Sequence, residues 1–262
     1  MIQQKLKKKR RLRRNLIGSL LCTGVLMVFA ISGQANPCGN AAGGDSVAST
    51  GNTEAYVELG IMNIKEGKWD NFLPAVQHNI INSRNEPGNM AFSLYQPENG
   101  KPQALWFEKF ENKAAHKKHK EQPYFKVAMK AIEESLEGEI ISILLKEVEE
   151  IPSTIPVFAA EPATTRNIIV LFDVKPERRQ DFIKAIAEVS PHSRQAMGNL
   201  GFNIYQYADD PNKFALLEGW ESEAAHEAHL AQGYSKKLNA ALDGLFVTNP
   251  MDARWLVKDI SQ

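Results

Sequence analysis

The chain has 262 residues, of which 43% are hydrophobic and 24% are charged, and its 31 basic residues balance 31 acidic ones. This composition is that of an ordinary globular protein and argues against an intrinsically disordered chain. The length allows one large domain or two small ones.

Residues 1–35 have the pattern of an export signal. Lys5–Arg14 carries eight basic residues and no acidic one, Leu16–Ile31 is almost entirely apolar, and the small residues of Ser32–Ala35 follow. The pattern predicts a signal peptide cut after Ala35, and hence a periplasmic or secreted protein that touches the membrane only through this segment. The alternative is an uncleaved anchor, for which the apolar run is short compared with the roughly 20 residues that span a bilayer.

Removing this segment changes the charge and the cysteine count. Eight of the 31 basic residues leave, so 23 basic and 31 acidic residues give the mature chain a formal charge of −8. An acidic chain without a basic stripe argues against a nucleic-acid partner. Cys38, in the flexible leader predicted over residues 36–54, is then the only cysteine, so no disulfide can form within the chain.

Residues 55–151 alternate between strand and helix patterns. Apolar residues from Trp69 to Ile80 mark one face of a helix, and Glu86-Pro87-Gly88 cannot continue it. In chain order the pattern predicts a strand over Tyr56–Ile64, this helix, strands over Met90–Gln96 and Ala104–Phe110, a helix over Ala114–Leu136 with a break at Pro123, and a strand over Ile140–Val148.

A proline-rich linker, residues 152–164, separates this domain from a second one over residues 165–262. The same order of elements is predicted again. It consists of a strand over Asn167–Lys175, a helix marked by Phe182, Ile183, Ile186 and Val189, strands over Leu200–Tyr207 and Phe214–Trp220, a helix over Glu223–Leu245, and a strand over Ala253–Lys258.

The two domains are copies of one another. Glu108–His119 recurs as Glu218–His229 with both histidines retained, and the offset of 110 residues holds without a gap for many residues on either side. A solenoid repeat is much shorter than this period, so the chain carries a duplicated domain.

Each copy has the order βαββαβ, which is the ferredoxin-like arrangement of an antiparallel sheet with helices on one face. The third strand is apolar on both faces, with Trp106 and Phe110 on one and Leu105 and Phe107 on the other. The helices of one domain cover only one face, so the other needs a second sheet. We predict an α+β protein in which two ferredoxin-like domains pack sheet to sheet as an internal pseudo-dimer.

Several motifs resemble the antibiotic biosynthesis monooxygenase superfamily of dimeric α+β barrels. They are Arg84–Gly88, Phe92–Tyr95, Glu108 followed by Phe110-Glu111, and a helix ending in His119 before Gln122-Pro123-Tyr124, and in the second domain Gly198, Glu218–Glu221, His229 and Tyr234. The resemblance implies a pocket between sheet and helices that binds a flat phenolic or quinoid molecule. It also implies oxidation by O2 with no metal and no organic cofactor. The haem-degrading branch is a poorer match, because Met129 and Asn239 stand where its haem-ligating histidine is expected.

The residues that we expect in these pockets include a base, since a group with a pKa near ambient pH in an apolar pocket suits deprotonation of a phenol. The catalytic candidates are His119, His229, Glu108 and Glu218. The substrate-binding candidates are Phe110, Trp220, Tyr95, Tyr205, Tyr124 and Tyr234.

Each candidate has a structural alternative. The histidines could tie helix to strand, the glutamates could pair with Arg84 and Arg194, and the tyrosines could simply pack. His116 and His226 are interpreted as structural or exposed, although the spacing of His116 and His119 also fits a metal site completed by Glu108.

Two other functions stay open on the sequence. A non-catalytic binding or stress-response protein could have the same fold, and so could an isomerase of a small carbonyl signal. The two copies also differ, since Glu86-Pro87 is replaced by Ala196-Met197 and Phe110 by Trp220. One pocket could therefore serve as scaffold alone.

Overall fold

The computed structural model describes residues 54–262, so the predicted signal segment and most of the predicted leader lie outside the described residues. The first half has four strands and three helices in the predicted order. They are β1 (Tyr56–Ile64), α2 (Trp69–Ser83), β2 (Asn89–Pro97), β3 (Gln103–Phe110), α3 (Lys113–Glu121), α4 (Pro123–Ser135) and β4 (Leu136–Glu147).

The second half repeats these elements and adds three short 3₁₀ helices. They are η1 (Pro162–Thr164), β5 (Arg166–Asp173), η2 (Pro176–Arg178), α5 (Arg179–Gln195), β6 (Asn199–Tyr207), β7 (Lys213–Trp220), α6 (Glu223–Leu230), α7 (Gly233–Ala241), η3 (Pro250–Ala253) and β8 (Arg254–Asp259). No helix within residues 54–262 is both long enough and apolar enough to cross a bilayer.

Both halves break their second helical stretch at the same point. Gln122 is extended (ψ 145°) because the following Pro123 disfavours helical backbone before it. The single helix predicted over Glu223–Leu245 is wrong, since Gln232 is likewise extended (ψ 151°) and the helix stops after Ala241. Gly233 replaces the proline, and glycine costs about 1 kcal/mol in a helix interior, so continuing the helix gains little there.

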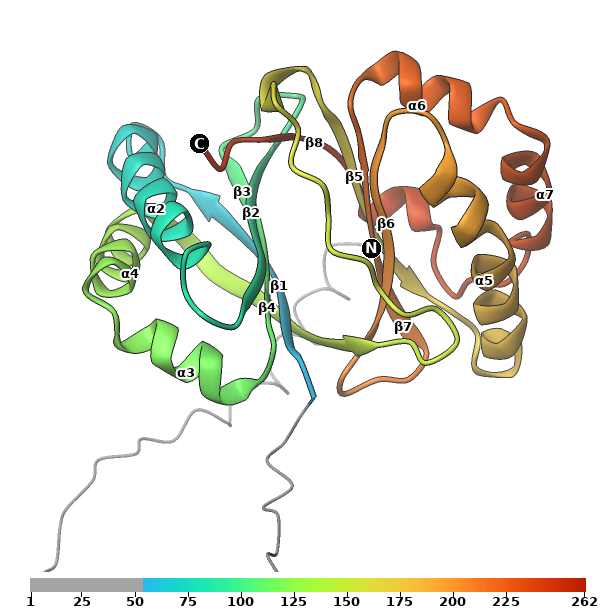
Figure 1. Cartoon of the computed structure of the whole chain (residues 1–262), viewed down its shortest axis with the longest axis horizontal. Helices are drawn as coiled ribbons and strands as arrows, with labels where there is room; N and C mark the ends of the chain where they lie inside the picture. The colour runs from blue at the N-terminus through green and yellow to red at the C-terminus, as the bar shows by residue number, and fades with distance from the viewer. Residues whose placement is uncertain (1–53) are drawn as a thin grey trace, which may run out of the picture. The chain divides into compact units, whose positions relative to one another are not determined.

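The eight strands close into one barrel in the order β1-β3-β2-β8-β5-β7-β6-β4 (Figure 1). Two antiparallel seams join the halves, with Tyr95 opposite Asp259 in one and Tyr205 opposite Glu147 in the other. Closure leaves no free sheet edge along this ring.

Each half also places its last residues in the core of the other. Val148 and Ile151 pack among the apolar residues between the second-half sheet and its helices. Ile260 packs between the first-half sheet and its helices, and its carbonyl accepts a 2.9 Å hydrogen bond from Gln77 on α2. The two halves are therefore interlocked by more than their strand seams.

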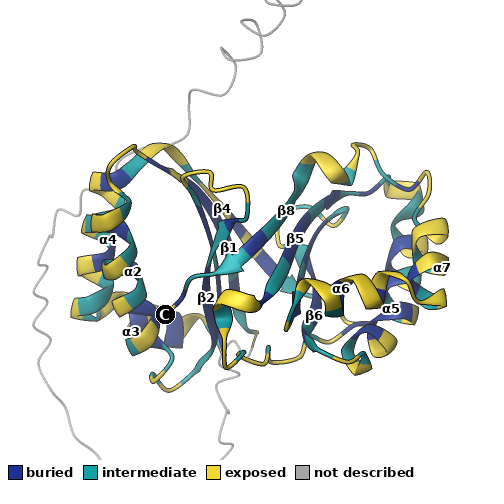
Figure 2. Ribbon diagram, turned by 90° about the horizontal axis from the view of Figure 1, so that it is seen from above, coloured by how far each residue is buried: buried dark blue, intermediate teal, exposed yellow. Residues whose placement is uncertain are grey.

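Three apolar layers result, with the barrel interior between two groups of helices (Figure 2). Leu105 and Phe107 point into the interior, where Ile169 and Tyr205 of the second half meet them. This confirms the prediction that the second copy covers the open face of the first sheet.

Candidate active site

A cavity of about 240 Å³ lies in the first half, between the sheet and helices α2, α3 and α4. Most of its lining is apolar or aromatic, and the polar groups are few. The lining residues are Tyr56, Glu58, Met62, Val76, Asn79, Phe92, Leu94, Trp106, Glu108, His116, Lys120, Phe125, Ala128, Met129, Ile132 and Ile140. An apolar pocket with a few convergent polar groups is the usual form of a small-molecule site.

The polar groups of this cavity gather around two glutamates. Glu58 on β1 lies directly opposite Glu108 on β3, and Glu108 is buried with its Oε1 3.4 Å from Nε2 of His116 on α3. His116 is itself buried, and its ring stacks on Tyr56 with centroids 3.7 Å apart. The phenol of Tyr56 donates to Glu58, and burial together with this bond raises its pKa, so it stays protonated. The site therefore brings together a glutamate and a histidine, two side chains of the kinds that act as general bases.

One wall of the cavity depends on a glycine. Gly60 lies opposite Trp106 in the β1–β3 pair. A Cβ on Gly60 would lie 1.9 Å from two carbons of the indole ring, so the ring occupies the space that any larger residue would need. The absent side chain lets Trp106 lie over the strand.

His119, predicted to be catalytic, is fully buried behind the cavity lining. Its Nδ1 is 2.7 Å from Glu86, which also accepts a 2.6 Å hydrogen bond from the Tyr124 hydroxyl. Its Nε2 has no hydrogen-bond partner among the described residues. The ring lies among phenylalanines, including Phe110, whose centroid is 5.2 Å away. His119 thus reaches the cavity only through its neighbours, and its predicted role remains a prediction.

In the second half, aromatic side chains fill the space between sheet and helices. Phe172, Phe182, Phe214 and Phe246 form a contiguous cluster with ring centroids 4.7–6.1 Å apart. Phe172 takes the place of Met62, which lines the first-half cavity. This half therefore has no equivalent of the 240 Å³ cavity among the cavities of the described residues.

Glu218 keeps the position of Glu108 but not its surroundings. Ile168 lies opposite it in place of Glu58, and the fully buried Trp220 donates a 2.7 Å hydrogen bond to its Oε1. Burial raises the pKa of Glu218 to about 7, and the Trp220 bond and Arg254 offset only part of this rise. Trp220, predicted to bind substrate, is thus a core residue that holds a buried carboxyl group.

His229 and Tyr234 line a different depression of the second half. It has a volume of about 300 Å³ and lies beside Ala196, the residue that replaces Glu86. His229 Nδ1 is 3.2 Å from the Tyr234 hydroxyl. Burial lowers the pKa of His229 to about 4, and burial followed by Arg254 does the same for His226, so both are neutral near pH 7.

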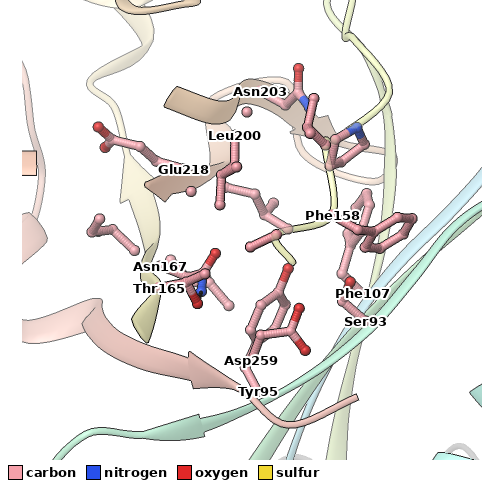
Figure 3. A pocket seen from close by; sticks show the side chains of 18 of the residues that line it. Ser93, Tyr95, Phe107, Phe158, Thr165, Asn167, Leu200, Asn203, Glu218 and Asp259 are labelled. Carbon is pink, nitrogen blue, oxygen red and sulfur yellow. Dashed lines mark hydrogen bonds between the residues drawn. The ribbon is translucent and has the colours of Figure 1, made fainter. Parts of the chain in front are cut away.

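Tyr95 and Tyr205 lie inside the barrel, on the opposite sheet face from the first-half cavity. They line a cavity of about 50 Å³ together with Asp259 and linker residues (Figure 3). Glu218 also borders this cavity, but Figure 3 shows its carboxylate pointing away from Tyr95. Since one water needs about 10–15 Å³ by this measure, the space holds a few waters and no aromatic ring.

Of the predicted residues, only Glu108 lines the first-half cavity. Glu58 was missed because its partner is set by the β1–β3 register, which one strand does not reveal. His116 was expected to be structural or exposed, yet it is 8% exposed and lines the cavity. The alternative in which the glutamates pair with Arg84 and Arg194 is not what the structure shows, since Glu108 contacts His116 and the two arginines donate through Nε to the carbonyls of Phe92 and Phe202.

We expect Glu218→Gln to stabilise the protein at pH 8 but not at pH 4.5. The folded state keeps the Glu218 proton up to about pH 7, whereas the unfolded chain releases it near 4.5. Stability of the wild type therefore falls as pH rises between these values, by at most about 3 kcal/mol. Glutamine cannot titrate and still accepts the Trp220 bond. Urea unfolding at both pH values, with the exposed Glu221→Gln as control, measures this, and an equal change at both would contradict it.

The family described as antibiotic biosynthesis monooxygenase matches the chain twice, over residues 55–131 and 166–241. A segment of 56 residues is 36% identical to "Putative monooxygenase YcnE" of Bacillus subtilis, and covers 21% of this chain and 59% of that protein. Another, of 75 residues, is 35% identical to an uncharacterised protein of Synechocystis and covers 29% of this chain and 51% of that protein. The chain therefore spans between half and two thirds of the length of these two relatives.

Solved structures share the tandem barrel. A Fusobacterium nucleatum protein described by the same term as YcnE has a TM-score of 0.72 at 16% identity, over 79% of this chain and 93% of that one. An anthrone oxidase-like protein has a TM-score of 0.54 at 12% identity, over 79% of this chain and 91% of its own. Identities this low show a common fold and nothing finer.

Proposed function

Because this chain belongs to the antibiotic biosynthesis monooxygenase family in both of its halves, we propose that it is an exported monooxygenase that oxidises a small quinol or phenol with O2 in the first-half cavity. The observation that carries the proposal is the buried pair of Glu108 and His116 at one end of a mostly apolar cavity. At about 240 Å³ this cavity is smaller than typical drug-sized pockets, which suits a molecule of one or two rings.

In this reaction the protein has to deprotonate the substrate, position its ring and exclude water. The substrate hydroxyl gives its proton to the Glu108–His116 pair, and the electron-rich anion then supplies, in the course of the reaction, all four electrons that reduce O2. A quinol that gains one oxygen atom becomes a hydroxyquinone, and the second oxygen atom leaves as water. The apolar walls keep bulk water away from the anion, and Trp106 and Phe92 offer aromatic faces for the ring.

Only the first half performs this reaction in our proposal. The second half keeps Glu218 and His226 but lacks the cavity, and its sheet closes the barrel that supports the first. Export rests on the basic and apolar pattern of residues 1–35, which would place the reaction in the periplasm or outside the cell.

The test is oxygen uptake by the purified, metal-stripped protein with a panel of reduced naphthoquinols and anthrones. Anthrones are included because one structure of this fold is described as anthrone oxidase-like. We expect uptake above the autoxidation rate with at least one compound, one water formed per O2, and a product with one more oxygen atom and two fewer hydrogen atoms than the substrate. No uptake across the panel by folded protein would reject the proposal and favour a binding protein.

A further inference from the structure

The first-half cavity contains two like charges that face each other. Glu58 and Glu108 are direct cross-strand neighbours, and like charges in that position are destabilising. One carboxylate oxygen of each glutamate and one ring nitrogen of His116 all lie within 4.8 Å of one another.

No lysine or arginine within residues 54–262 pairs with either carboxylate. Glu108 has only His116 within ion-pair distance, and Glu58 has no such partner among the described residues. Lys120 lines the cavity but is exposed and belongs to none of these pairs. Glu58 instead accepts hydroxyl hydrogen bonds on its two oxygens, from Tyr56 and from Ser142 at 2.5 Å. The side chains around the two glutamates supply no cation, so a cationic group on a ligand would complement this end of the cavity.

The remainder of the cavity shows what carries that cation. Trp106, Phe92 and Phe125 give it aromatic walls, and aromatic faces attract ammonium groups. Asn79 is 4% exposed, and its side-chain oxygen accepts no hydrogen bond from the described residues. A bare metal ion would use the acidic end and leave this aromatic volume empty, whereas an organic cation uses both.

We propose that the cavity selects a phenolic or quinolic ring that bears a protonated alkylamine on the carbon next to the hydroxyl. The ammonium lies against Glu58 and the hydroxyl against the Glu108–His116 pair. Because these acceptors lie within 4.8 Å of one another, the two ligand groups occupy neighbouring ring positions rather than opposite ones. The inference rests on the proposed function, since it names the substrate class of the same cavity.

The second half offers a natural comparison. In the second half, Ile168 replaces Glu58, Val189 replaces Asn79 and Leu216 replaces Trp106. This half therefore lacks the carboxyl group for the ammonium, the side-chain hydrogen-bond acceptor and the aromatic wall together. The loss of all three in the half without the cavity is consistent with one shared role in the first half.

Calorimetric binding of three matched compounds to the purified protein tests the proposal. We expect 2-(aminomethyl)phenol to bind about tenfold or more tightly than neutral 2-methylphenol, a difference near 1.4 kcal/mol, and more tightly than 4-(aminomethyl)phenol. Glu58→Gln abolishes this preference without weakening 2-methylphenol binding. Glu58→Asp keeps part of it, and Glu218→Gln in the second half leaves it unchanged.

Equal affinities for the three compounds, or a preference that survives Glu58→Gln, would overturn the inference. Zn²⁺ and Mn²⁺ are titrated as well, first into the protein alone and then in the presence of 2-(aminomethyl)phenol. An ion that binds through Glu58 and displaces the amine would show that the cluster is a metal site, and would overturn the inference. Oxygen uptake separates this inference from the function. Uptake with neutral quinols and no amine preference overturns only the inference, whereas amine preference without uptake by any compound overturns only the oxygenase.

Discussion

Replacing Glu108 by Gln lowers the rate of substrate-dependent oxygen uptake by about 10²- to 10⁴-fold, the range typical of losing a positioned general base. Glutamine has nearly the same shape, so the cavity and the contact with His116 persist while the proton acceptor is lost. Since the ionised substrate is what reduces O2, the defect should appear in kcat and shrink as pH approaches the pKa of the free phenol.

The duplication supplies the control for this experiment. Glu218→Gln makes the same substitution at the matching position of the half without the cavity, and we expect less than a twofold change in uptake. His116→Ala and His226→Ala form a second matched pair. We expect a large loss of oxygen uptake for His116→Ala and less than a twofold change for His226→Ala. Equal losses in both halves, or a full rate in Glu108→Gln, would show that the base lies elsewhere, with His119 as the next candidate.

Gly60→Val should remove the cavity wall and destabilise the protein by about 3 kcal/mol or more, at the upper end of the cost of overpacking. A Cβ at this position lies 1.9 Å from the Trp106 ring, which must leave its site. In the second half the corresponding cross-strand pair is Val170 and Leu216, which fit together. The double substitution Gly60→Val with Trp106→Leu therefore reproduces a pairing that the chain already contains.

The double variant should recover most of the stability lost in Gly60→Val while remaining inactive. Denaturant unfolding of both single variants and the double variant gives the coupling free energy between the two positions, which we expect to exceed about 1.5 kcal/mol. Additive effects of the two substitutions would contradict the contact. Recovered stability together with full oxygen uptake would show that Trp106 is not needed in the cavity.

The sequence predicted the fold because the relevant patterns are local and occur twice. The alternation around Phe107 and the helical face from Trp69 to Ile80 placed the elements, and the doubly apolar strand required a second sheet. The interlocking of the halves was not predicted, since Val148 and Ile260 join their cores across long sequence separations.

The candidate site was predicted less well because it depends on the register between strands and on small differences in how deeply neighbouring side chains are buried. His116 and His119 lie one helical turn apart, and no periodicity says which of them borders a cavity. Glu58 looked like an ordinary strand residue until its partner across the sheet was known. The filling of the second half likewise follows from Phe172 and Phe246 meeting in space, which spacing along the chain does not reveal.

The closed tandem barrel has a consequence for how this chain can vary. In a barrel made from two identical chains, every substitution appears twice, so a residue that opens one cavity opens the other and both lose packing. Here the two halves are encoded separately, and the pairs Glu58 and Ile168, or Gly60 and Val170, show that they have diverged. One half can carry the unfilled volume and unpaired charge that chemistry requires, while the other compensates through a solid aromatic core. Within one polypeptide chain, one half can thus contribute stability while the other holds the reactive site.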